Sequence, residues 1–278
     1  MKAPAALIAA LVVVLFVLFH PASADPAREF ATLCSDGKLA RDAGFRATVE
    51  ALKQAVGADS CACAGAALAR RRRLVLRGKG LTDLRPLAPL RGLRDLDLRD
   101  NRISDLSPLR KLSSLGRLNL ARNHVTDLSP LSGLTGLEVL EAQDNRITSI
   151  DAVAGITALE RVNLARNTIS DAAALADAEK LMELDLSGNG LRAAPSLRRL
   201  SQLRRLDLSL NRIVDTSPLV RTRAGSRPLA PLTLDLSHNL IRDMTPLSLE
   251  GRLDRLNLAG NPLPEGTPCP PHVVGCQR

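Results

Sequence analysis

The stretch DLDLRDNRISDLSPL, residues 95–109, recurs along the chain with small changes. It returns as NLARNHVTDLSPL from Asn119 and as DLSLNRIVDTSPL from Asp207. In each copy the central residues alternate between apolar and polar, which predicts a short strand with its leucines on one face. The asparagine follows where the chain must turn, and its amide can bond backbone groups that the bend leaves unpaired. The proline of the return segment favours an extended or single-turn connection over a long helix.

A fixed spacing connects the copies. The asparagines are 22 residues apart, with one step of 28, and they are Asn101, Asn123, Asn145, Asn167, Asn189, Asn211, Asn239 and Asn261. Lys79 occupies the equivalent position in an earlier copy, so these eight asparagines and Lys79 mark nine copies. One coil alone cannot bury its leucines, whereas stacked coils bury them on both sides, at roughly 1.5–3 kcal/mol for each fully buried leucine before entropy is counted. The period therefore predicts a solenoid.

This repeat resembles that of the leucine-rich-repeat family over residues 74–264. Its 22-residue period and D-L-S-P-L return resemble the subclass found in bacterial internalins and in a leucine-rich regulator of a protein phosphatase. The resemblance implies an α/β solenoid, a right-handed arc with a parallel β-sheet on its concave face and short 3₁₀ or extended segments on its convex face. It also implies a disulfide-containing cap at the C-terminus and, as in internalins, binding of another macromolecule.

The N-terminal segment has the anatomy of a secretory signal peptide. A positive start, an apolar run over residues 3–19 and the small residues of Ala22-Ser23-Ala24 predict cleavage before Asp25. An uncleaved anchor is the alternative, although the run falls short of the roughly 20 apolar residues that a membrane-spanning helix needs. We therefore expect a secreted, periplasmic or envelope protein whose mature chain has no transmembrane segment.

Four regions follow from these patterns: a signal peptide (1–24), a helical N-terminal cap (25–71), the repeats (72–264) and a C-terminal cap (265–278). Residues 25–34 and 45–58 of the N-terminal cap read as two amphipathic helices. Their predicted apolar set is Leu33, Phe45, Val49, Leu52 and Val56.

The five cysteines lie outside the repeats, and disulfides persist in the oxidising compartments to which export leads. Cys269 and Cys276 form the clearer pair at the C-terminal end. At the N-terminal end Cys34 has two candidate partners, Cys61 and Cys63, and spacing alone does not choose between them. We expect no metal site and no cofactor.

The polar side chains between the leucines of each strand form the candidate binding site. The chain carries no nucleophile–base pair or phosphate-binding loop at a recognisable spacing, so we expect no enzymatic activity. A solvated polar face is the alternative to a docking face, and a calcium site on the aspartates at 185, 207 and 235 is a weaker one. The candidate residues on the concave face are Asp97, Arg99, Arg117, Asn119, Glu141, Gln143, Arg161, Asn163, Glu183, Asp185, Arg205, Asp207, Asp235, Arg255 and Asn257.

Composition restricts the partners. The net charge of +9 favours anionic ones. With neither Trp nor Tyr, the chain lacks the rings on which nucleic-acid bases stack, so we expect a protein ligand and no nucleic acid. The alternative is a structural envelope protein that adsorbs to anionic polymers through basic patches. One such patch is residues 69–77, and another is the basic bulge of the 28-residue step, with Arg221, Arg223 and Arg227.

Overall fold

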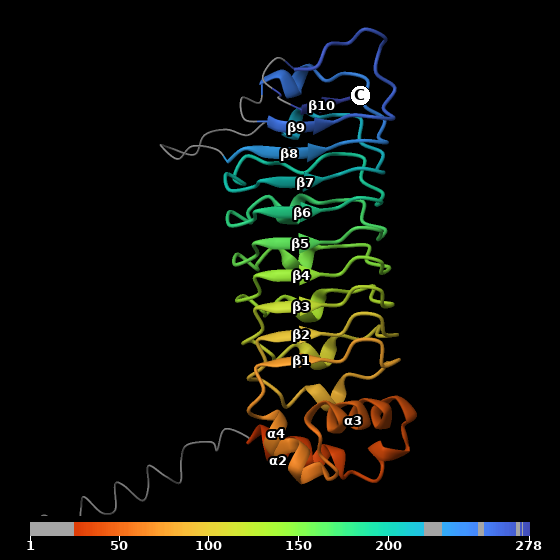
Figure 1. Cartoon of the computed structure of the whole chain (residues 1–278), viewed down its shortest axis with the longest axis vertical. Coiled ribbons are helices and arrows are strands. Elements are labelled where there is room, and N and C mark those ends of the chain that lie inside the picture. The colour runs from red at the N-terminus through yellow and green to blue at the C-terminus, as the bar shows by residue number, and fades with distance from the viewer. Residues whose placement is uncertain (1–24, 220–229, 250–252, 271–272, 274) are drawn as a thin grey trace, which may run out of the picture.

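The computed structural model describes residues 25–219, 230–249, 253–270, 273 and 275–278. Within these residues ten strands form one parallel sheet in chain order, stacked along an elongated molecule (Figure 1). The predicted solenoid is confirmed. The strands are β1 (Arg73–Val75), β2 (Asp95–Asp97), β3 (Arg117–Asn119), β4 (Val139–Glu141), β5 (Arg161–Asn163), β6 (Glu183–Asp185), β7 (Arg205–Asp207), β8 (Leu232–Asp235), β9 (Leu253–Asn257) and β10 (Gly275–Gln277).

Each repeat strand is short and buries its middle. In β2, Leu96 is buried between two half-buried aspartates. The register sets Leu96 beside Leu74 of β1 and Leu118 of β3, so each leucine packs on its counterparts in the coils before and after it. The apolar core is therefore one continuous aliphatic column, as the repeat predicts.

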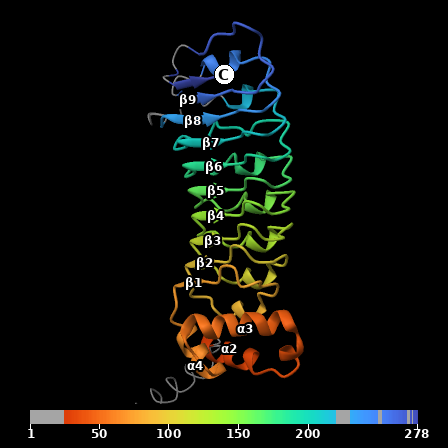
Figure 2. The same ribbon diagram turned by 45° about the vertical axis from the view of Figure 1, so that its right-hand side comes forward.

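The return segments are mostly single turns of 3₁₀ helix, which Figure 2 shows to the right of the strands. An aspartate starts most of them: Asp105 Oδ1 accepts the backbone N–H of Ser107 at 2.8 Å, and Asp127 does the same for Ser129 at 2.7 Å. This is why the D-x-S part of the repeat recurs. The 3₁₀ turns are η2 (Arg85–Leu87), η3 (Ser107–Leu109), η4 (Ser129–Leu131), η5 (Asp151–Val153), η6 (Ala173–Leu175), η7 (Ser217–Leu219) and η8 (Thr245–Leu249).

The described return between β6 and β7 contains no 3₁₀ turn. Here Ala193 replaces the starting aspartate, and Pro195 occupies the position of the residue whose N–H that aspartate would bond. Proline has no N–H, so the turn cannot begin in this way. Ala193 instead forms a parallel bridge with Asp215 of the next coil.

Three α-helices cover the N-terminal end of the stack: α2 (Pro26–Cys34), α3 (Ala43–Val56) and α4 (Cys61–Leu68), with a 3₁₀ turn, η1 (Leu39–Arg41), between the first two. Only two helices were predicted, because the CACAGAAL segment of α4 consists of small residues without a clear amphipathic period. Its small residues allow close packing, since a side chain at Gly65 would collide with the carbonyl of Ala27 in α2.

The apolar set of this cap agrees only in part with the prediction. Phe45, Val49 and Leu52 are buried, whereas Leu33 and Val56 are partly buried and pack against the edge of the core. Phe30, which was not in the predicted set, is fully buried.

Disulfides fasten both ends. Cys34 of α2 is bonded to Cys61 of α4, which settles the open pairing and leaves Cys63 as an exposed free thiol. At the other end the predicted Cys269–Cys276 bond is present. Cys276 lies in β10, a strand that the repeat pattern does not contain and that pairs in parallel with β9.

Candidate functional site

The outward side chains of the strands form two columns in the predicted register. Glu141 lies beside Asn119 and Asn163, and Asp207 lies beside Asp185. Parallel strands are about 4.8 Å apart, so the members of a column are near neighbours. We name this surface the sheet face, and the predicted site residues on it are Asp97, Arg117, Asn119, Glu141, Arg161, Asn163, Glu183, Asp185, Arg205, Asp207, Asp235, Arg255 and Asn257.

Most residues of the central column also close the turn after their own strand. Asp185 Oδ1 accepts the backbone N–H of Ser187 at 2.9 Å and its hydroxyl at 2.7 Å. Asn119 Oδ1 accepts the N–H of Ala121 at 3.0 Å. Sequence reasoning missed this structural role, which leaves only part of each side chain free for a ligand. The same backbone bond is made by Asp97, Asn163, Asp207, Asp235 and Asn257.

Glu141 is the one predicted site residue of this column that does not form this bond. Its side chain is half-buried and forms no hydrogen bond or ion pair with any residue that the structure describes. Burial raises the pKa of its carboxyl above 4.5; the charge of Arg161 opposes this shift, and those of Asp185 and Glu183 add to it. The carboxylate therefore has unused capacity to accept hydrogen bonds.

Gln143 follows Glu141 in the same coil. It is half-buried, and its Oε1 has no hydrogen-bond partner among the described residues. Arg99, the other predicted residue beyond a strand end, instead lies with its Nε 3.2 Å from Asp97 Oδ2. The coil of β4 thus carries two side-chain acceptors without a protein partner among the described residues, the half-buried Glu141 carboxylate and the buried Gln143 Oε1.

A shallow depression of about 230 Å³ lies beside Glu141. Its polar lining comes from four successive strands, β4 to β7, and combines two arginines with three carboxylates. A site of mixed charge can bind a ligand that carries both a cation and an anion, because each ligand group finds an opposite charge. The lining residues are Glu141, Arg161, Val162, Asn163, Glu183, Leu184, Asp185 and Arg205.

The aspartate strip continues the sheet face beyond the depression. Burial raises the pKa of Asp207, the bonds from Ser209 oppose this, and the charges of Asp185 and Asp235 add to it. Asp235 Oδ2 accepts the Asn257 amide at 2.9 Å. Among the described residues there is no group of three or more His, Cys, Asp or Glu side chains that could hold a metal ion.

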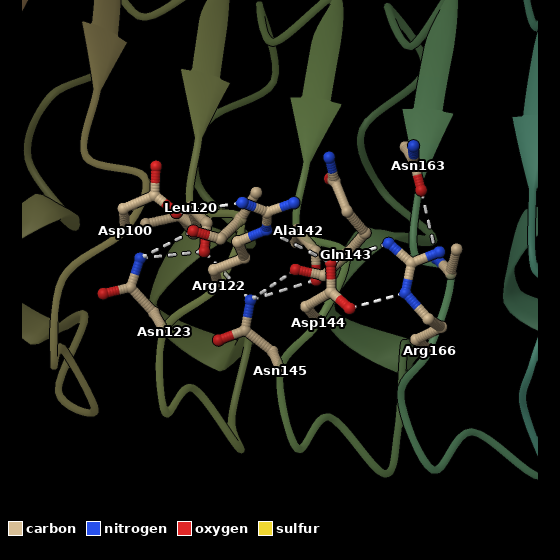
Figure 3. A network of polar contacts seen from close by, with 12 residues as sticks. Asp100, Leu120, Arg122, Asn123, Ala142, Gln143, Asp144, Asn145, Asn163 and Arg166 are labelled. Carbon is tan, nitrogen blue, oxygen red and sulfur yellow. Dashed lines mark hydrogen bonds and ion pairs between the residues drawn. The ribbon is translucent and has the colours of Figure 1, made fainter. Parts of the chain in front are cut away.

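A second polar network, absent from the predicted site, lies where the chain leaves each strand (Figure 3). Arg77 Nε is 2.7 Å from Asp100 Oδ2, and Arg122 bridges Asp100 at 3.5 Å and Asp144 at 3.8 Å. Arg166 Nη2 donates to Asp144 Oδ2 at 2.7 Å. The signal in the sequence is the alternation of aspartate and arginine immediately before Asn101, Asn123, Asn145 and Asn167; Arg77 lies outside this alternation. We name these five side chains the corner ladder.

Two further predictions concern the basic bulge and the absence of a transmembrane segment. Arg221, Arg223 and Arg227 of the basic bulge lie outside the described residues. In the described part of the chain, no helix has the length and apolar character needed to cross a membrane.

Comparisons with known proteins agree with the architecture. The family described as Leucine Rich repeats (2 copies) matches residues 91–133, and no curated protein matches the sequence. Internalin C2 from Listeria monocytogenes str. 4b F2365 has a similar structure, with a TM-score of 0.59 and 25% identity over 83% of this chain and 91% of the internalin.

Two receptors are also similar. TLR13, in a complex with ssRNA13, has a TM-score of 0.56 and 25% identity over 70% of this chain and 29% of that one. The leucine-rich-repeat ectodomain of the receptor kinase GASSHO1/SCHENGEN3 from Arabidopsis thaliana, in complex with CASPARIAN STRIP INTEGRITY FACTOR 2, has a TM-score of 0.52 and 26% identity over 64% of this chain and 22% of that one. With its parallel sheet, its asparagine spacing and these matches, the chain is a leucine-rich-repeat protein with repeats that resemble those of internalins.

Proposed function

We propose that this protein is an exported binding module that recognises a protein ligand through the sheet face around Glu141. The observation that carries the proposal is the half-buried Glu141 carboxylate, which has no partner among the described residues. Burial of an unpaired polar group is unfavourable, so a ligand that supplies a partner gains free energy. A lysine or arginine of the ligand would fill this role.

The neighbouring charges extend the same recognition. Arg161 and Arg205 line the depression beside Glu141 and can hold a carboxylate of the ligand. Each hydrogen bond to a charged group contributes roughly 1.5–3 kcal/mol. Since the chain has no Trp or Tyr to provide aromatic anchors, affinity would depend on such bonds and would fall as salt is added.

Export is part of the proposal. Two disulfides, Cys34–Cys61 and Cys269–Cys276, suit an oxidising compartment, and residues 1–24 have the pattern of a signal peptide. The similarity to internalin C2 and to a receptor ectodomain bound to a factor supports binding as the activity.

The test is affinity capture from culture medium and envelope extract with residues 25–278. A double variant, Glu141→Arg with Arg161→Glu, exchanges the two charges of the depression without altering net charge. The matched control exchanges an exposed ion pair elsewhere, Asp177→Arg with Arg199→Glu, whose partners are 2.8 Å apart. We expect a discrete protein that the native chain and the control capture and the Glu141/Arg161 variant does not. Equal capture by all three folded proteins contradicts the proposal.

A further inference from the structure

A group of arginines gathers at the N-terminal edge of the first strands, on the side opposite the corner ladder along each strand. Arg70 to Arg73 lead from α4 into β1, Arg94 immediately precedes β2, and Arg117 begins β3. All six side chains are exposed. Three of them border a hollow of about 500 Å³, which we name the arginine groove; its lining is Arg72, Arg94, Asp95, Ser114, Gly116, Arg117, Gly136 and Glu138.

The arginines at this edge differ from those of the corner ladder in their pairing. In the corner ladder Arg77, Arg122 and Arg166 all form ion pairs with aspartates. At the N-terminal edge only Arg73 forms one, with Asp95 at 3.4 Å, and the other five have no ion-pair partner among the described residues. The arginines of the corner ladder are therefore engaged by aspartates, whereas most of those at the N-terminal edge have no such partner among the described residues.

The hollow exists because Gly116 interrupts a column of longer residues. Gly116 occupies the position that Arg94 and Glu138 hold in the adjacent coils. A Cβ at Gly116 would have no neighbour nearer than 3.8 Å, and one at Gly136 none nearer than 3.9 Å. Packing does not require glycine at either position, and its effect is to leave room for a ligand between the charged side chains.

Three features of the lining identify the ligand chemistry. Guanidinium groups bind carboxylate or sulfate through paired hydrogen bonds, and the groove has one on each of three successive coils, which suits a chain with repeated anions. Asp95, Glu138 and Ser114 are acceptors for hydroxyl groups. We propose that the arginine groove binds a linear acidic polysaccharide, which carries both anions and hydroxyls.

Other anionic polymers fit less well. The phenyl rings of Phe30 and Phe45 are buried in the N-terminal cap, and the lining of the arginine groove contains no aromatic residue on which bases could stack. The groove is lined only by polar residues and glycine, whereas the centre of a protein interface is enriched in apolar side chains. A nucleic acid would also bring phosphates toward Asp95 and Glu138 with few hydroxyls to satisfy them.

The test measures fluorescence anisotropy of labelled polygalacturonate and dextran sulfate with residues 25–278, at about 0.15 M salt. The groove variant is Arg94→Glu with Arg117→Glu. Its control is Arg192→Glu with Arg212→Glu, which makes the same change of net charge at exposed arginines that form no ion pair with a described residue. Thermal unfolding checks that both variants are folded. We expect the groove variant to bind at least one of the two polymers at least about tenfold more weakly and the control to bind within about twofold of the native protein.

Two further arms separate specific recognition from general attraction to charge. Glu138→Ala should weaken binding to the same polysaccharide, because a hydroxyl acceptor is lost; stronger binding would overturn the proposal, since mere attraction of a polyanion improves when a carboxylate is removed. A thymidine oligonucleotide and polyglutamate should bind more weakly than the polysaccharide. Tighter binding of either, equal loss in the two double variants, or no polysaccharide binding also overturns it.

Discussion

Asn123 Oδ1 accepts the backbone N–H of Ile103, a residue of the preceding coil, at 3.0 Å. The same amide donates to the carbonyl of Leu98 at 3.1 Å and to that of Leu120, in its own coil, at 2.9 Å. One buried side chain thus supplies both donors and acceptors to backbone groups that the turn leaves unpaired. The pattern repeats along the stack and explains why asparagine recurs; its other members are Asn101, Asn145, Asn167, Asn189, Asn211, Asn239 and Asn261.

Replacing Asn123 by alanine should therefore destabilise the protein strongly. The change leaves the N–H of Ile103 and the carbonyls of Leu98 and Leu120 without this partner, and each unsatisfied buried group costs about 1–3 kcal/mol. We expect a loss of roughly 3 kcal/mol in the free energy of unfolding, measured by urea denaturation. Thr126→Ala, at an exposed position of the same coil, should change it by less than about 0.5 kcal/mol. Similar losses in the two variants would contradict this role of the buried asparagines.

The leucine column gives a second prediction. Leu140 is fully buried and lies in register between Leu118 and Val162. Leu140→Ala should lower the free energy of unfolding by about 2–5 kcal/mol, because it opens a cavity between coils. Thermal or urea unfolding measures the loss, and a value below about 1 kcal/mol would show that the coils can close over the gap.

The corner ladder should stabilise the protein only modestly. The hydrogen bond from Arg166, followed by the charges of Arg166 and Arg122, lowers the pKa of Asp144 below 3.8. A lowered pKa gives stability that is present above the unfolded pKa and lost as the pH falls through the folded one. Asp144→Asn should thus cost less than about 1 kcal/mol at neutral pH, and the difference should shrink in acid and at high salt. A difference that grows in acid would contradict this pairing.

Glu141 should behave in the opposite way. Its pKa is raised above 4.5 by burial, so the unfolded chain loses the proton first and the native state becomes less favourable as the pH rises through this range. Glu141→Gln is therefore expected to raise the free energy of unfolding at neutral pH. Urea unfolding over a pH series should show the gain disappearing below pH 4.5. A neutral or destabilising change at neutral pH would mean that the protein already satisfies this carboxylate.

Most of the fold could be predicted because the repeat encodes it locally. Leu96 in a period-two strand, Asn101 at the turn and Pro108 in the return fix the geometry of one coil, and the 22-residue spacing stacks the coils. The elements that were not predicted do not follow the 22-residue period. Helix α4 consists of small residues, β10 follows the last repeat, and Pro195 shifts one return by a single residue.

The sequence predicted which residues of the candidate site are neighbours. It did not predict which of them close turns and which remain without a partner. The columns follow from strand alternation, so the relation of Glu141 to Asn119 and Asn163 needs only the register. One oxygen of Asp185 accepts a hydrogen bond from Ser187, whereas Glu141 accepts none from its own turn. This difference depends on side-chain length and on the exact turn, which the repeat pattern does not contain. The corner ladder likewise becomes evident only when residues 22 positions apart in the sequence are placed in adjacent coils.

The most direct test of ligand binding at the sheet face is site-specific photocrosslinking. A photoreactive residue replaces Val139, half-buried on the sheet face between Arg117 and Arg161, or Thr148, exposed in a return segment. After illumination with the extract used for capture, the protein labelled at Val139 should form a discrete adduct with the captured ligand, and the one labelled at Thr148 should form none. An adduct from Thr148 alone, or equal adducts from both positions, would contradict binding at the sheet face.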